Sequence, residues 1–85
     1  MHTRHEYFQT ASGLLYLRFE RPRWAYADTW YWVFLGSTSL GTVKRIKGQR
    51  LWSIVKDHNG LSLSKVFGTR RAAVMELLRI AGYDS

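Results

Sequence analysis

The 85-residue sequence contains no cysteine, only one proline and no long hydrophobic run. Without cysteine the chain can form neither a disulfide framework nor a thiolate metal site, which fits a reducing compartment. A membrane-spanning helix would need about eighteen consecutive apolar residues, and the sequence has no such stretch. Residues 1–6 also lack the apolar middle of a signal peptide. We therefore expect a cytoplasmic protein without a membrane partner.

Residue types that build catalytic or metal centres are also scarce. The six acidic residues are scattered singly, and the three histidines are His2, His5 and His58. A zinc site needs about three or four convergent ligands. Phosphate-binding loops, a Gly-x-Ser-x-Gly elbow and paired carboxylates are missing from the sequence as well. We predict a non-enzymatic protein that uses no metal and no cofactor.

What the sequence does have is apolar and aromatic side chains, at 46% and 15% of its residues. This composition predicts a folded globular chain, and the length fits one small domain with a single core. Within residues 1–85 we expect a flexible polar segment, then aromatic strands, then basic strands followed by a helix. These parts are residues 1–12, 13–41 and 42–82, respectively.

Two strands are predicted in the aromatic part. In Leu14–Glu20 every second residue is apolar, which indicates a strand with one buried face formed by Leu15, Leu17 and Phe19. Trp30–Leu35 is apolar on both faces. Such a strand is either covered on both sides or presents one side to a partner. In the second case a protein partner or a second copy would bind through Trp30, Trp32 and Phe34.

Three further strands are predicted in the basic part, at Thr42–Ile46, Leu51–Lys56 and Leu61–Phe67. The last two are separated by Asp57-His58-Asn59-Gly60. Asn-Gly between apolar-rich runs favours a tight hairpin, because both residues tolerate a positive φ.

The chain is expected to end in one amphipathic helix, Arg70–Ala81, with Thr69 as N-cap and Gly82 at the C-terminal end. Arg71 and Glu76 should point into solvent. The apolar stripe that should pack on the sheet consists of Ala73, Val74, Leu77, Leu78 and Ala81. Together these elements predict an α+β fold in which a four- or five-stranded antiparallel sheet packs on one C-terminal α-helix.

The positive charge is concentrated in the basic part. Residues 42–71 carry eight Lys and Arg and one acidic residue, so they account for the whole net charge of +7. A localised basic field is typical of proteins that bind polyanions. Trp52 could stack on a base or pack in the core. The candidate nucleic-acid-binding residues are Lys44, Arg45, Lys47, Arg50, Trp52, Lys56, Lys65 and Arg70.

The segment Phe67-Gly68-Thr69-Arg70-Arg71-Ala72-Ala73-Val74 resembles the end of AP2-type domains, which include the N-terminal DNA-binding domains of phage and transposon tyrosine integrases. Gly41–Arg45 and Trp52–Lys56 resemble the first two strands of such domains, so the resemblance covers residues 41–82. It implies a three-stranded antiparallel sheet, backed by one helix, that places its exposed face against DNA. Similar endings occur in small proteins of phages and high-GC bacteria.

Charge and resemblance lead to the same prediction. We expect a small nucleic-acid-binding protein, phage or prophage encoded, that grips double-stranded DNA rather than RNA through a basic sheet face. Arg18, which precedes the basic part, should matter little for binding. The alternative is a protein-interaction module, either a phage factor that binds a host protein or a homo-oligomer formed through the aromatic strands.

Overall fold

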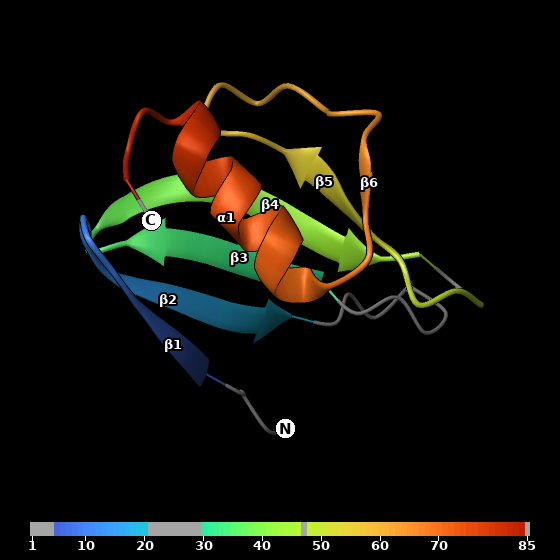
Figure 1. The fold of residues 1–85 in the computed structure, drawn as a ribbon, viewed down its shortest axis with the longest axis horizontal. Coiled ribbons are helices and arrows are strands. Elements are labelled where there is room, and N and C mark those ends of the chain that lie inside the picture. The colour runs from blue at the N-terminus through green and yellow to red at the C-terminus, as the bar shows by residue number, and fades with distance from the viewer. Residues whose placement is uncertain (1–4, 21–29, 47, 85) are drawn as a thin grey trace.

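The computed structural model describes residues 5–20, 30–46 and 48–84. The six strands form one sheet in chain order, and every strand is antiparallel to its neighbours (Figure 1). In sequence order the elements are β1 (His5–Thr10), β2 (Gly13–Glu20), β3 (Trp30–Leu35), β4 (Thr38–Arg45), β5 (Trp52–Lys56), β6 (Val66–Phe67) and α1 (Arg70–Ile80). The predicted α+β class with one C-terminal helix is confirmed, and the sheet has six strands instead of four or five.

The additional strand is β1, which lies in the segment expected to be flexible. It pairs with β2 along its whole length, from His5 opposite Arg18 to Thr10 opposite Gly13. Thr10 closes this hairpin, because its hydroxyl donates to the Gly13 carbonyl at 2.7 Å and accepts from the Ser12 amide at 3.2 Å. Residues 1–4 of the expected flexible segment lie outside the described residues.

The predicted strand Leu61–Phe67 is much shorter in the structure, where β6 contains two residues. The reason lies in the preceding turn. The Asp57 carboxylate accepts the amides of Asn59 and Leu61 at 2.8 and 2.9 Å, and Gly60 has a φ of 79°. These hydrogen bonds, above all the one from the Leu61 amide, hold the pKa of Asp57 below its ordinary value. The chain then follows β5 irregularly, with the Ser62 hydroxyl donating to the Val55 carbonyl at 2.7 Å and the Leu63 amide to the Ile54 carbonyl at 3.5 Å. Regular pairing with β5 resumes at Val66.

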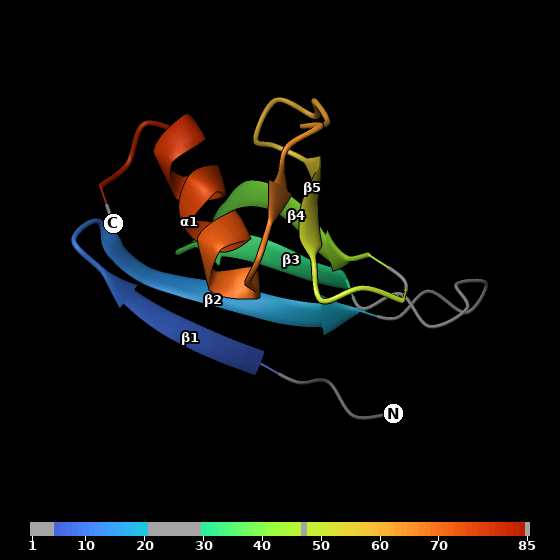
Figure 2. The same ribbon diagram turned by 45° about the vertical axis from the view of Figure 1, so that its right-hand side comes forward.

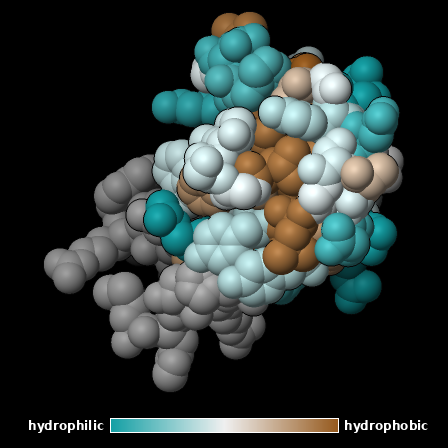
Figure 3. All heavy atoms as spheres, turned by 90° about the vertical axis from the view of Figure 1, so that its left-hand side faces the viewer, coloured by the Kyte–Doolittle hydropathy of each residue, from teal (hydrophilic) through white to brown (hydrophobic). Residues whose placement is uncertain are grey.

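The sheet is a half-barrel that curls around the helix (Figure 2). We call the side of the sheet that faces α1 the inner face and the opposite side the outer face. The core lies between the inner face and the helix. Its fully buried members include Leu15, Leu17, Val33, Val43, Val74, Leu77 and Leu78. Seen from the end that carries the β1–β2 turn, a narrow band of hydrophobic side chains is framed by more polar ones (Figure 3).

Two irregularities in strand pairing help to bend the sheet. The register shifts between Val33 and Phe34, which leaves Leu40 on β4 without an opposite residue and turns it into the core. Next to it, Gly41 has a φ of 131°, and a Cβ there would lie 2.1 Å from the Lys56 carbonyl oxygen. A second shift follows at Thr42 and Val43. Position 41 requires glycine, because the backbone of Lys56 lies too close for any side chain there.

The helix ends as its sequence predicts. The Thr69 hydroxyl accepts the Ala72 amide at 3.1 Å, which satisfies one of the free amides of the first turn. At the other end Gly82 has a φ of 89°, and the amides of Gly82 and Tyr83 bond back to Arg79 and Leu78. The predicted stripe faces the sheet, with four of its residues fully buried and Ala81 partly buried.

Candidate nucleic-acid interface

The strand register determines which side chains share the outer face, because opposite residues in an antiparallel pair lie on the same side of the sheet. Three rows of such residues cross the strands. The first is Tyr7, Tyr16 and Phe34; the second is Arg18, Trp32, Thr42 and Lys56; the third is Trp30, Lys44, Ser53 and Val66. The outer face therefore combines five aromatic side chains with three cations.

The first row, which we call the aromatic row, is a continuous series of rings from β1 to β3. The ring centroids of Tyr7 and Tyr16 lie 5.3 Å apart, and those of Tyr16 and Phe34 lie 5.9 Å apart. Tyr7, on the edge strand, keeps 57% of its surface exposed. Trp30 and Trp32, in the neighbouring rows, are partly buried. One face of Trp30–Leu35 is therefore core, and the other is an aromatic surface that no helix of the described residues covers.

The cations of the outer face lie beside these rings. Lys44 is partly buried opposite Trp30, and Lys56 is exposed opposite Thr42. The guanidinium carbon of Arg18 lies 5.7 Å from the Phe34 ring centroid. Arg18, which precedes the basic part in the sequence, thus lies on the same face of the sheet as Lys44 and Lys56. The alternation along Leu14–Glu20 already separated Arg18 from the core residues, which is the signal that identifies its side of the sheet.

Four other predicted residues gather where the sheet meets the start of α1. Arg45 lies opposite Trp52 and shares the inner side with it. Arg45 also donates through Nε to the Gln49 carbonyl at 3.2 Å. We call Arg45, Arg50, Trp52 and Arg70 the rim cluster. It surrounds a hollow of about 360 Å³ lined by Arg45, Arg50, Trp52, Gly68, Thr69 and Arg70.

Within the rim cluster, Arg70 and Trp52 take part in the packing of the fold. The Arg70 guanidinium carbon lies 4.6 Å from the Tyr31 ring centroid and 5.9 Å from that of Trp52. Its Nη2 forms an ion pair with Glu6 on β1. Trp52 packs against the hydrophobic core, as in the core alternative for this residue. Arg70 thus connects the start of the helix to the first strand.

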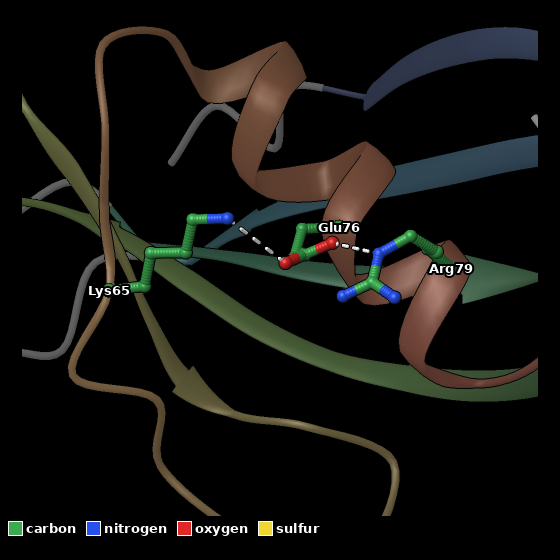
Figure 4. A network of polar contacts seen from close by, with 3 residues as sticks. All are labelled: Lys65, Glu76 and Arg79. Carbon is green, nitrogen blue, oxygen red and sulfur yellow. Dashed lines mark hydrogen bonds and ion pairs between the residues drawn. The ribbon is translucent and has the colours of Figure 1, made fainter.

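Lys65 lies apart from both groups, on the flank of the helix (Figure 4). Its Nζ is 3.5 Å from Glu76 Oε2 and 5.5 Å from the Phe67 ring centroid. Glu76 also accepts a hydrogen bond from Arg79 Nε, which is the main reason why the pKa of Glu76 is lowered. The Glu76 side chain is only 12% exposed, so the expectation that it points freely into solvent is wrong.

The predicted site residues therefore do not form one basic sheet face. Lys44 and Lys56 lie on the outer face; Arg45, Arg50, Trp52 and Arg70 form the rim cluster; Lys65 lies on the helix flank; Lys47 is outside the described residues. The main reason is that adjacent residues on a strand, such as Lys44 and Arg45, point to opposite sides. Cations and aromatic rings meet on the outer face, where phosphates and bases could be bound together.

Residues 5–20, 30–46 and 48–84 contain no group of three or more His, Cys, Asp or Glu arranged to hold a metal ion. In the same residues, no helix has the length and hydrophobicity needed to cross a membrane.

Comparison with protein-family models, curated proteins and solved structures found no match to this chain. The resemblance of residues 41–82 to AP2-type domains thus remains a prediction.

Proposed function

We propose that this protein binds nucleic acid through the outer face of its sheet. The observation that carries the proposal is the register of the strands, which brings Arg18, Lys44 and Lys56 onto the same helix-free face as five aromatic side chains. Cations attract the phosphates, and aromatic rings offer contact area to sugars and bases.

The electrostatics of the whole chain support the same function. A net charge of +7 on 85 residues produces a positive field that attracts polyanions from a distance. The rim cluster contributes Arg45 and Arg50, both exposed, to this field from the inner side of the sheet near the start of α1. Lys65 and Arg70 contribute less to this site, since their charges are shared with Glu76 and Glu6.

The test is the salt dependence of binding to labelled DNA and RNA oligonucleotides, measured by fluorescence anisotropy. If Lys44 and Lys56 each neutralise one phosphate, the double variant Lys44→Ala/Lys56→Ala should lower the slope of log K against log salt by about 1.4 to 1.8. A matched control is Lys65→Ala/Arg71→Ala, which removes the same charge from the helix side of the molecule. Its slope should stay close to that of the parent.

Two results would contradict the proposal. One is the absence of binding to any oligonucleotide at low salt. The other is an equal loss of slope in both double variants, which would mean that the total charge matters and the outer face does not.

The alternative function, self-association through Trp30, Trp32 and Phe34, uses the same face. Two copies joined there would bring Arg18, Lys44 and Lys56 of one copy close to the same cations of the other. Like charges facing each other across an interface are unfavourable. This argument favours a polyanionic ligand over a second copy, and sedimentation velocity of the free protein tests it directly.

A further inference from the structure

We infer that the ligand of the outer face is a single-stranded nucleic acid whose bases stack on the aromatic side chains, an inference that rests on the proposed function. It differs from the expectation of duplex binding, which came from the charge and the resemblance. Four properties of the outer face support a single strand.

The first property is the amount of exposed aromatic surface. The rings of the aromatic row are tilted against each other by 43° and 35°, so they do not lie flat on one another. Tyr7, at one end of the row, is more than half exposed. A ring with a free side can receive a base of any type, because every base has a flat π-face. Tyr7 therefore provides a sequence-tolerant stacking position at one end of the row.

The second property is the width of the sheet. Six strands about 4.8 Å apart span roughly 24 Å, whereas the major groove of B-DNA is about 12 Å wide. The row from Arg18 on β2 to Lys56 on β5 crosses four strands, or about 14 Å, and cannot enter such a groove as a whole. In a duplex the base faces are also covered by neighbouring base pairs. The exposed ring of Tyr7 would then meet only sugars and phosphates.

The third property is the curvature of the sheet. Its concave side holds the helix, so the outer face is convex (Figure 2). A convex surface touches a cylindrical duplex along a narrow line. A flexible single strand can follow the same surface and bring successive bases onto different strands of the sheet.

The fourth property is the position of the cations relative to the rings. Arg18 lies two residues after Tyr16 on β2, and Trp32 lies two residues before Phe34 on β3. Each step of this kind is about 6.7 Å along a strand. The row of Arg18, Trp32 and Lys56 thus lies beside the aromatic row. A strand whose bases stack on the aromatic row would have its phosphates within reach of these cations.

The experiment compares three labelled probes of about 12 nucleotides each at one salt concentration. They are a single-stranded oligothymidine, a blunt duplex, and a single strand with abasic sites in place of all bases. Phosphate contacts alone predict equal affinity for the two single strands. Stacking of even one base predicts that oligothymidine binds about 5- to 150-fold more tightly than the abasic strand. We expect it to bind more tightly than the duplex as well.

The variants are chosen at Tyr7, because an exposed residue on an edge strand can be changed without disturbing the core. Tyr7→Ala should weaken oligothymidine binding by about 5- to 150-fold and leave abasic-strand binding unchanged. Tyr7→Phe keeps the ring and should bind like the parent. Trp32→Leu, on β3, provides a second position. Circular dichroism of each variant checks that the fold is intact.

The outcomes separate the two proposals. Equal binding of oligothymidine and the abasic strand, or tighter binding of the duplex, overturns the inference and leaves nucleic-acid binding standing. If none of the three probes binds, the proposed function fails. A dimer that Tyr7→Ala dissociates would show that a second copy covers this face, and it would also overturn the inference.

Discussion

Consecutive residues of strand β3 point to opposite faces of the sheet, and the two faces differ in the type of side chain that they carry. Tyr31 and Val33 point inward and are almost completely buried under the helix, together with aliphatic neighbours such as Leu17 and Val43. Trp30, Trp32 and Phe34 point outward, next to Arg18 and Lys44. Aliphatic side chains fill a core at high density, whereas aromatic rings beside cations are typical of binding surfaces.

This contrast indicates which residues support the fold and which could serve the proposed binding. A sheet face that only meets water is normally polar, and large exposed apolar patches usually mark interaction sites. The inner face is covered by the helix, whose apolar stripe is buried against it. No helix of the described chain covers the outer face. Changes on the inner face should therefore affect folding, and changes on the outer face should affect binding.

The largest effect is expected for Leu77→Ala on the inner side. Leu77 is fully buried in the helix stripe, so its truncation should destabilise the protein by about 2–5 kcal/mol. The control is Leu14→Ala on the outer side, where the leucine is 47% exposed and its loss should cost much less. Thermal or urea unfolding measures both. Equal losses would mean that the two faces do not differ as described.

A smaller effect is expected for Arg70→Ala, which tests whether this cation belongs to the fold. Its guanidinium stacks over Tyr31 and pairs with Glu6, so we expect a loss of about 1–2 kcal/mol in the free energy of unfolding. The control is its neighbour Arg71→Ala, an exposed helix position expected to change stability by less than about 0.5 kcal/mol. Nearly full binding of single strands by a folded Arg70→Ala variant would separate the rim cluster from the outer face.

The smallest effect concerns the pH dependence at Glu76. The hydrogen bond from Arg79 holds the pKa of Glu76 below its ordinary value of 4.5 in the folded protein. Its stabilisation is therefore fully present above pH 4.5 and is lost as the pH falls through the lower folded pKa. Glu76→Gln should lower Tm near neutral pH, and the difference from the parent should shrink in acid. A difference in Tm that stays constant down to low pH would contradict this.

Much of the fold could be predicted from local sequence rules. The helix, its Thr69 cap and its Gly82 end follow from short-range hydrogen bonding, and the buried face of β2 follows from simple alternation. Strand β1 was missed because its sequence is mostly polar, and it becomes a strand through pairing with β2. The extent of β6 was overestimated because after the Asp57 turn the chain follows β5 through irregular hydrogen bonds, including one from the Ser62 hydroxyl, and not through a regular ladder.

The candidate site was harder to predict than the fold, since it depends on which strands are neighbours. Alternation alone separates Lys44 from Arg45, and this could have been recognised in the sequence. The proximity of Arg18 to Trp32 and of Lys56 to Thr42 depends on the register. That register includes a pairing shift at Thr42 and Val43, which no local pattern in the sequence indicates.

The chain order of the strands has a consequence for how the molecule forms. Because every strand of the described sheet pairs with its neighbours in sequence, its ladders are built by hairpins, without a long crossover. Low contact order of this kind is associated with fast folding. The helix comes last and closes the inner side, where Arg70 reaches back across the chain to Glu6. All the cations and aromatic rings of the proposed binding face lie on the first five strands, so this face takes no residue from the helix.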